Sequence, residues 1–330
     1  MKKYDFVSIG DITTDAFIRL KDASVHCDIN KENCQLCVDF GAKIPYESVT
    51  EVLAVGNSTN AAVSAHRLGL NSAPYTNIGN DEGGKKCLEK LQAEGISTEL
   101  IEAHDGKHTN YHYVLWYEDE RTILIKHEEF EYKIPDMGDE GWLYLSSTGE
   151  NSVPYHHELA TWLKENPKIK LAFQPGTFQI KLGKDELADI YAVSEVFFCN
   201  VQEAQKILVT DEGDIKKLME GIHALGPKIT VVTDGPKGAY ALDAEGQAWF
   251  MPPYPDPKPP LDRTGAGDSF SSAFVSALAL GKNVDEAITW APINSMSVVQ
   301  YVGAQEGLLT QEQIKDYISK APEDYKAKQI

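Results

Sequence analysis

The segment Asp262-Arg-Thr-Gly-Ala-Gly-Asp268 has the residue types of a phosphate-binding turn that leads into a helix. Gly265 and Gly267 let the backbone turn tightly, and the N-terminus of a helix favours negative charge. The segment therefore predicts an anion hole formed by the amides of Gly265, Ala266 and Gly267. Asp268 would then lie beside a bound phosphate, where it can accept a proton from an attacking hydroxyl. Alternatively, Asp268 only complements the helix dipole and the glycines only end a loop.

The rest of the chain indicates the elements that must position this turn. Short apolar runs at residues 6–9, 169–173, 196–199 and 229–232 are each followed by turn residues. Apolar residues recur at helical spacing across 215–225 and 270–278. This pattern predicts an α/β fold, a three-layer α/β/α sandwich with a mostly parallel central sheet.

Two segments complete this layout. The proline-rich residues 251–260 are expected to be extended and to carry the chain to the anion hole. Thr310 and Gln313 have the spacing of a capping box, so we expect the chain to close on a helix.

Residues 14–55 and 108–127 do not follow the βα rhythm. The second of these segments reads as two strands around an acidic turn at 118–120. We expect both insertions to form a small β lid on a single domain of residues 1–330, closing over the substrate. If the lid exposes an apolar face, pairing of two lids would bury it and form a homodimer.

Polar residues at predicted strand ends are candidates for binding. Asp11 and Asp15 flank the end of a strand, where open α/β sheets bind ligands, and a carboxylate there can accept two hydroxyls of a polyol. The alternative is that both are turn or helix-cap residues. Asn200 and Glu203 follow another strand and share one face of a helix that begins there, which suits water-mediated contact with Mg²⁺. For Asn200 the alternative is again a helix cap.

The segment VTDGPKG at residues 232–238 is a candidate nucleotide loop. Gly235 and Gly238 free the backbone to pass close to a nucleotide, and Thr233 offers a hydroxyl to a phosphate. An ordinary hairpin turn is an equally simple interpretation.

Composition excludes some partners. The net charge of −19 and the pI near 4.9 disfavour nucleic acid and anionic membrane surfaces. The N-terminal residues alternate polar and apolar types like a strand, and no stretch of 18 apolar residues occurs, so we expect a cytoplasmic protein. Its five cysteines are then predicted to be free and metal-free thiols.

Three other patterns resemble functional sites. Residues 79–85, GNDEGGK, match the letters of a P-loop, but Lys86 stands where Ser or Thr must bind Mg²⁺, so we reject that interpretation. A zinc site is an alternative for four residues in the predicted lid: His26, Cys27, Cys34 and Cys37. His156 and His157 are expected on the solvent side of a helix.

The segment DRTGAGDSF resembles the C-terminal signature of the ribokinase-like (PfkB) kinase family. Further segments are similar to that family: GDITTD at 10–15, GNSTNAAVSAHRLG at 56–69, NVQEA at 200–204 and VTDGPKG at 232–238. Val55 departs from the pattern, which commonly has a second glycine there. The resemblance extends over about residues 4–310.

This resemblance implies transfer of the ATP γ-phosphoryl group to an alcohol, with Asp268 as general base. It implies that Asn200 and Glu203 hold Mg²⁺ through water. It places Asp262, Thr264 and Gly303 at a site for K⁺ or a similar monovalent cation, and residues around Asn294 and Ser297 at the adenine.

An unphosphorylated, ribose-like sugar is the first choice of substrate. The residues that the resemblance assigns to it are Asp15, Gly56, Asn57 and Asn60, with Glu150 and Gln174 as additions. A nucleoside is the runner-up, because four lid aromatics offer stacking faces: Phe17, Tyr111, Tyr113 and Trp116. A phosphorylated sugar is disfavoured by the acidity near the site. A non-catalytic metabolite-binding protein is a further alternative, against which stands the presence of Asp268, Asn200 and Glu203 together.

Overall fold

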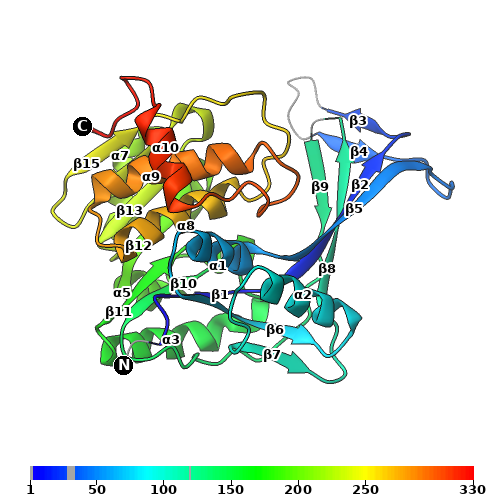
Figure 1. Cartoon of the computed structure of the whole chain (residues 1–330), viewed down its shortest axis with the longest axis horizontal. Helices are drawn as coiled ribbons and strands as arrows, with labels where there is room; N and C mark the ends of the chain where they lie inside the picture. Colours follow the sequence, from blue (N-terminus) through cyan, green and yellow to red (C-terminus); the bar gives the residue numbers. More distant parts are fainter. Residues whose placement is uncertain (1–2, 28–33, 119) are drawn as a thin grey trace.

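The structure is a computed structural model that describes residues 3–27, 34–118 and 120–330. A body built on a large sheet carries a smaller sheet that projects from one side (Figure 1). This arrangement confirms the predicted α/β fold with a β lid. Within those ranges no helix combines the length and apolar character needed to span a membrane.

The sheet of the body is parallel over most of its width. From one edge the strands are β7 (Ile101–His104), β6 (Ser72–Gly79), β1 (Phe6–Ile9), β10 (Gly141–Leu145), β11 (Ile169–Phe173), β12 (Ser194–Asn200) and β13 (Ile229–Thr233), followed by the antiparallel β14 (Ala239–Leu242), β15 (Ala248–Met251) and β16 (Lys328–Gln329). The four apolar runs predicted as strands lie in β1, β11, β12 and β13. They are mostly apolar because helices cover both faces of the sheet.

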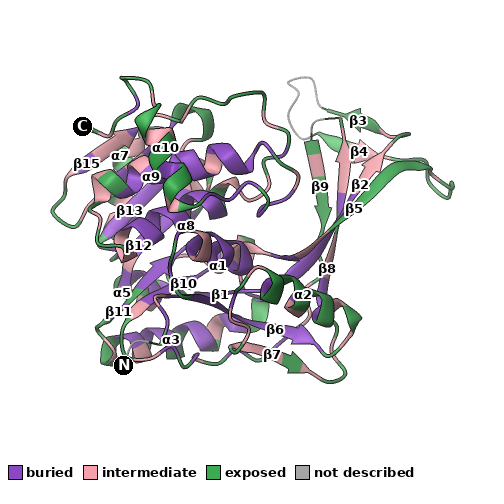
Figure 2. Cartoon of the chain, in the orientation of Figure 1, coloured by how far each residue is buried: buried purple, intermediate pink, exposed green. Residues whose placement is uncertain are grey.

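Two hydrophobic cores lie on the two faces of this sheet (Figure 2). One face is covered by α3 (Val153–Glu165), α5 (Ala188–Val193), α6 (Val201–Leu208) and α7 (Ile215–His223), and the other by α1 (Asn57–Arg67), α8 (Ala266–Ala279), α9 (Val284–Val298) and α10 (Gln311–Ser319). The shorter or peripheral helices are α2 (Glu82–Ala93), α4 (Thr177–Leu182) and the 3-10 helices η1 (Glu150–Ser152) and η2 (Gly235–Lys237).

The predicted capping box at the start of α10 is present, since Gln313 N donates to Thr310 Oγ1 and Thr310 N donates to Gln313 Oε1. The chain does not close on this helix, however. It continues into β16, which pairs with β15 and extends the sheet.

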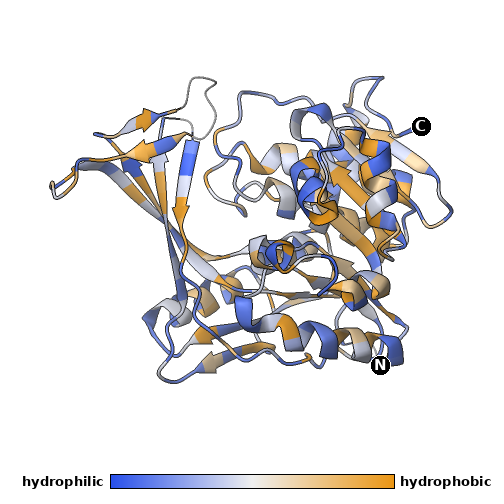
Figure 3. Cartoon of the chain, turned by 180° about the vertical axis from the view of Figure 1, so that it is seen from behind, coloured by the Kyte–Doolittle hydropathy of each residue, from blue (hydrophilic) through white to orange (hydrophobic). Residues whose placement is uncertain are grey.

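The lid is a four-stranded sheet with a hairpin at its far end. Its strands, in spatial order, are β5 (Tyr46–Val55), β2 (Thr13–Leu20), β8 (Asn110–Tyr117) and β9 (Glu120–Leu124), and the hairpin is β3 (Ser24–His26) with β4 (Gln35–Cys37). On one face Phe17 and Val114 are buried, whereas Ile123, paired with Val114, is 45% exposed. The opposite face exposes about half of each side chain at Val49, Tyr113 and Leu124. Hydrophobic and hydrophilic stretches are interspersed along the lid strands (Figure 3).

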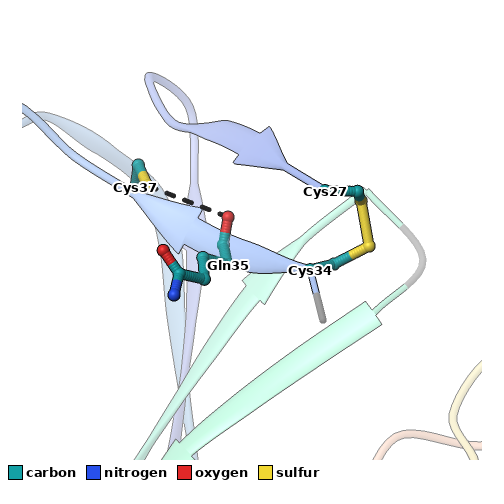
Figure 4. The surroundings of a disulfide bond; sticks show 4 residues. All are labelled: Cys27, Cys34, Gln35 and Cys37. Carbon is teal, nitrogen blue, oxygen red and sulfur yellow. Dashed lines mark hydrogen bonds between the residues drawn. A yellow bond between two sulfur atoms is a disulfide. The ribbon is translucent and has the colours of Figure 1, made fainter. Parts of the chain in front are cut away.

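The prediction of free cysteines is wrong for two of the five. Cys27 and Cys34 form a disulfide at the end of the β3–β4 hairpin (Figure 4). The antiparallel register ends on the pair His26 and Gln35, so the next residues along each strand face each other with Cα atoms 4.0 Å apart. Cys37, Cys87 and Cys199 are free. The disulfide also takes up two of the four sulfur and nitrogen ligands considered for zinc.

His156 does not lie on the solvent side of its helix. It is fully buried under α4, with Nε2 3.1 Å from Gln179 Nε2, and burial lowers its pKa to about 4, so its ring is neutral at pH 7. His157 is exposed as expected and lies 2.7 Å from Asp189. In the rejected P-loop, Asp81 caps α2 by accepting a hydrogen bond from Gly84 N.

Candidate active site

A cavity of about 430 Å³ opens between the body and the lid. It collects residues that lie far apart in the sequence. From the predicted set it is lined by Asp11, Asp15, Gly56, Asn57, Asn60, Gln174, Thr264, Gly265, Ala266, Gly267 and Asp268. The structure thus brings the predicted sugar-binding residues and the predicted anion hole to one place.

The predicted anion hole sits at the N-terminus of α8. Gly265 precedes this helix with φ 78°, in the left-handed region, and a Cβ there would come within 2.2 Å of Ala304 Cβ. Only glycine meets both requirements. Ala266 and Gly267 form the first turn of α8, where backbone N–H groups lack the carbonyl of a preceding helical turn. The amide of Gly267 is available to an anion in the cavity, whereas Ala266 N donates to Arg263 O in a long hydrogen bond of 3.4 Å that an anion would have to replace.

Asp268 lies just inside α8 and is only 6% exposed. Asn57 Nδ2 donates to its Oδ1 at 2.7 Å, Asn60 Nδ2 donates to its Oδ2 at 2.8 Å, and Gln174 Nε2 lies 3.4 Å from Oδ1. Burial raises the pKa of Asp268, and these amide donors oppose the rise. A carboxylate with a raised pKa, held on a helix beside an anion hole, has the properties of a general base.

Two histidines of the lid approach the aspartates at the sugar side of the cavity. His127 Nδ1 lies 2.8 Å from Asp11 Oδ2, while Tyr132 donates to Asp11 Oδ1 at 2.8 Å. His112 Nδ1 lies 3.3 Å from Asp15 Oδ1. That pair is not aligned for a hydrogen bond, and both Asp15 Oδ1 and His112 Nε2 are buried with no hydrogen-bond partner among the described residues. Such atoms are costly to bury unless a ligand or water satisfies them.

A second cavity, of about 390 Å³, adjoins the anion hole on its other side. Thr233, Gly235 and Gly238 of the predicted nucleotide loop line it, together with Ala266 and Gly267. Asn294 does not line it. That side chain is fully buried and bonded to Ser64 and to the backbone of Ser269 and Leu309, while the neighbouring Ser295 and Met296 face the cavity.

Asn200 and Glu203 form a reciprocal cap at the start of α6. Glu203 N donates to Asn200 Oδ1, and Asn200 N donates to Glu203 Oε2, both at 2.9 Å. Both residues line a small cavity of about 90 Å³ that also touches Gly267 and Gln174. Burial raises the pKa of Glu203. The cap holds both oxygen-bearing side chains beside the anion hole, a set suited to a hydrated Mg²⁺.

Asp262 stands behind the anion hole and is fully buried. Its carboxylate accepts hydrogen bonds from Thr264 N and Gly303 N, each at 2.8 Å. Gly303 thus contacts the loop of Asp262 and Thr264, beside which the family resemblance predicts a monovalent cation. Glu150 is exposed at the start of η1 and Ser297 is buried, and neither lines the two larger cavities beside the anion hole.

The lid aromatics expected to stack on a nucleoside base do not line the substrate cavity. Strand alternation places Tyr111 and Tyr113 on the outer face, where they border a different hollow with Asp81 and Lys86. Phe17 is 2% exposed, and two arginines cover the ring of Trp116. The aromatic ring that does line the cavity belongs to Phe178 of α4, edge-on to His127.

The residues of this cavity that the sequence did not single out include His112, His127, Phe178 and Arg263. The two histidines lie within the predicted lid, but the pairing of β2 with β8 that places His112 beside Asp15 joins distant strands and cannot be read from local spacing. Arg263 was read only as part of the glycine turn. It lines both larger cavities beside the anion hole, between the predicted nucleotide and sugar positions.

Comparisons with known proteins agree with this geometry. Residues 22–311 match the profile of the pfkB family carbohydrate kinase. The chain is 24% identical over 320 residues to an ATP-dependent 6-phosphofructokinase of Thermoanaerobacterium thermosaccharolyticum, covering 92% of this chain and 90% of that protein. It is 25% identical over 279 residues to the ribokinase of Haemophilus influenzae, covering 81% and 87%. The crystal structure of a Methanocaldococcus jannaschii nucleoside kinase shares the fold with a TM-score of 0.77, at 18% identity over 97% of this chain and 100% of that one.

The fold and the cavity define a phosphotransferase that uses an alcohol group as acceptor. The chain belongs to the pfkB family of carbohydrate kinases. Kinases of this family use ATP with Mg²⁺.

Proposed function

We propose that this kinase transfers the γ-phosphoryl group of ATP to a hydroxyl of a small unphosphorylated sugar of the ribose type. The choice of a sugar as substrate rests on two buried atoms that have no hydrogen-bond partner among the described residues, Asp15 Oδ1 and His112 Nε2. A sugar hydroxyl both donates and accepts, so one or two adjacent hydroxyls would satisfy both atoms at once. The nearby Asn57 and Asn60 then connect that sugar to Asp268.

In the reaction, a sugar hydroxyl gives its proton to the carboxylate of Asp268 while its oxygen attacks the γ-phosphorus. The bond from that phosphorus to the β,γ-bridging oxygen breaks, and ADP leaves. The amides of Ala266 and Gly267 hold the transferring group, so that catalysis consists mostly of positioning and charge stabilisation. Bound Mg²⁺ would neutralise the triphosphate, with Asn200 and Glu203 holding it through water. Thr233, Gly235 and Gly238 would pass along the nucleotide.

Three carboxylates line the sugar cavity, and Arg263 is its one lysine or arginine among the described residues. Asp11, Asp15 and Asp268 would repel a second phosphate on the sugar. This favours an unphosphorylated acceptor.

A nucleoside is the second candidate, and the observation in its favour is Phe178. Its ring lines the cavity beside His127, where the two could hold a base. Phe178→Ala separates the candidates, because it should raise KM for a nucleoside strongly and KM for a ribose-like sugar little.

A screen of ATP consumption over pentoses, hexoses, nucleosides and sugar phosphates tests the proposal. We expect the highest kcat/KM with a pentose or hexose. Fastest turnover of a nucleoside would establish the second candidate, and turnover of sugar phosphates alone would contradict both. No consumption with any of them would indicate a metabolite-binding protein.

The exposed outer face of the lid supports the proposed homodimer. Val49, Tyr113 and Leu124 would leave water if a second copy packed there. Sedimentation of the protein at micromolar concentration should give the mass of a dimer, and Tyr113→Glu should shift it toward monomer. A wild-type protein that sediments as a monomer would contradict this proposal.

A further inference from the structure

The carboxylate of Asp262 connects two loops behind the anion hole. Its Oδ1 accepts from Thr264 N and its Oδ2 accepts from Gly303 N. Thr264 directly precedes Gly265, whose left-handed conformation begins the turn into α8. The position of Asp262 therefore fixes the entry of the chain into the segment that presents the phosphate-binding amides.

Arg121 reaches this carboxylate from the lid. It lies on β9, with Nη2 3.2 Å from Asp262 Oδ1, and it donates to Leu261 O at 3.1 Å. The Arg121 side chain is 10% exposed and that of Asp262 is 0% exposed. Solvent screens such a pair weakly, and a buried carboxylate that loses its cation is strongly disfavoured. Within the described ranges no other lysine or arginine forms an ion pair with Asp262.

Trp116 of β8 holds this arginine in place, and it provides an internal comparison. The guanidinium groups of Arg121 and Arg19 both lie over its ring, 4.9 Å and 4.7 Å from the centroid. Arg19 pairs with Glu47 at the surface of the lid, where their side chains are 41% and 63% exposed. Of these two stacked arginines, only Arg121 contacts the body.

The strand that carries Arg121 also reaches the sugar. Ile123, two residues further along β9, lines the substrate cavity. Both side chains point to the same face of the lid, so the strand that positions Arg121 against Asp262 also lines the cavity proposed for the sugar.

We propose that Arg121 is a positioning residue for phosphoryl transfer, which neutralises Asp262 when the lid is closed and so fixes the loop that presents the amides of Ala266 and Gly267. The monovalent cation expected at Asp262 and Thr264 would serve the same carboxylate. In this chain the guanidinium of Arg121 supplies that positive charge. The inference rests on the kinase activity and not on the identity of the sugar.

The test compares Arg121→Met with Arg19→Met, two substitutions that remove a guanidinium from the same tryptophan ring. Turnover is measured with the best acceptor from the screen, in a buffer whose cation is bulky and organic. We expect kcat of Arg121→Met to fall about 10- to 100-fold, the scale of a small misplacement at a reacting centre, while ATP affinity is retained. Added guanidinium or potassium, below denaturing concentrations, should restore part of that loss. Arg19→Met should keep wild-type kcat.

Three outcomes would overturn the inference: equal kcat for the two variants, a loss of kcat that neither cation restores, or strong potassium stimulation of the wild type. If Arg121→Met does not fold, Arg121→Lys is tested instead, because lysine keeps the positive charge on a shorter side chain. Its kcat should be reduced and should be restored by guanidinium. A fully active Arg121→Lys variant, or a loss of kcat that guanidinium does not restore, would contradict the role of Arg121. A wild type inactive toward every sugar would instead refute the proposed sugar specificity, and the same comparison would then use the acceptor that is turned over.

Discussion

The two sides of the active-site cavity are built in different ways. On the phosphate side, Gly265, Ala266, Gly267 and Asp268 are consecutive residues at the start of a buried helix. On the sugar side, Asp15 and His112 lie nearly a hundred residues apart, on neighbouring strands of a lid whose outer face is solvent-exposed.

This difference assigns phosphoryl transfer to one side of the cavity and recognition of the acceptor to the other. The transfer of a phosphoryl group requires the same donors whatever the acceptor, and a single rigid helix end can carry them all. Recognition of the acceptor requires groups brought together across the cavity, on an element that can open and close. Substitutions on the phosphate side should therefore act on kcat, and those on the sugar side mostly on KM.

The largest expected effect is that of Asp268→Asn, which removes the ability to accept a proton but keeps the size of the side chain. We expect kcat to fall by about 10²- to 10⁴-fold, with ATP affinity nearly unchanged because the amides and Mg²⁺ hold the nucleotide. The fold should persist. Asn60 is held by Gln305, while Asn57 can turn its amide over to face the new side chain. Steady-state kinetics, ATP titration and thermal unfolding measure the three quantities.

Asp285→Asn is the matched control, since Asp285 is also an acidic residue in the first turn of a helix, α9, but lines neither of the larger cavities. Both changes should cost little stability if the acids only complement helix dipoles. An Asp268→Asn variant as active as Asp285→Asn would show that Asp268 is a cap and not a base.

The contrast between the two sides also decides what could be predicted from the sequence. The tight turn into α8 could be predicted down to single residues, because it depends on local backbone geometry at Gly265; the anion hole assigned to it stays a prediction. His112, the neighbour of Asp15, could not be predicted in this way. Its position depends on the register between β2 and β8, and sequence spacing does not specify a parallel pairing between distant strands. Asn294 shows the same limit within one helix. Its side chain is bonded inside the protein, while the next residue, Ser295, lines the nucleotide cavity, and the sequence does not distinguish these two neighbouring positions.

Asp15→Asn should have the second-largest effect, and it should change KM for the sugar rather than kcat. A hydrogen bond from a sugar hydroxyl to a carboxylate contributes about 1.5–3 kcal/mol, so KM for the sugar should rise about 10- to 150-fold while kcat changes less. The control is Asp39→Asn, an exposed carboxylate elsewhere in the lid that should leave KM unchanged. A large fall in kcat with unchanged KM would place Asp15 in the chemistry rather than in recognition.

A smaller effect concerns stability as a function of pH. Burial raises the pKa of Asp268, so the ionised form is disfavoured in the folded state. At pH below the unfolded-state value near 4, both states are protonated and the cost is absent. As pH rises through the folded pKa, the cost appears in full. The wild type should therefore lose stability relative to Asp268→Asn with increasing pH, by a few degrees in Tm at most, whereas its kcat should decline as pH falls through the same pKa.

Thermal unfolding of both proteins at several pH values measures this difference. A gap in Tm that stays constant with pH, or that favours the wild type more as pH rises, would mean that the amide donors outweigh burial at this carboxylate.

The smallest effect is expected at the tip of the lid. The disulfide between Cys27 and Cys34 closes the β3–β4 hairpin, whose three-residue strands are mostly exposed and line neither larger cavity. The disulfide stabilises the hairpin locally because it restricts the unfolded state of a short loop. Replacing both cysteines by serine removes that constraint. We expect kcat and KM to stay at wild-type values and proteolysis at the hairpin to become faster. Alkylation without reductant, followed by peptide mass analysis, should show Cys27 and Cys34 linked and Cys37 modified. Loss of activity in the double variant would mean that the lid tip contributes to the sugar side of the site, and stoichiometric zinc that disappears with it would mean that the tip binds metal; either result would contradict this prediction.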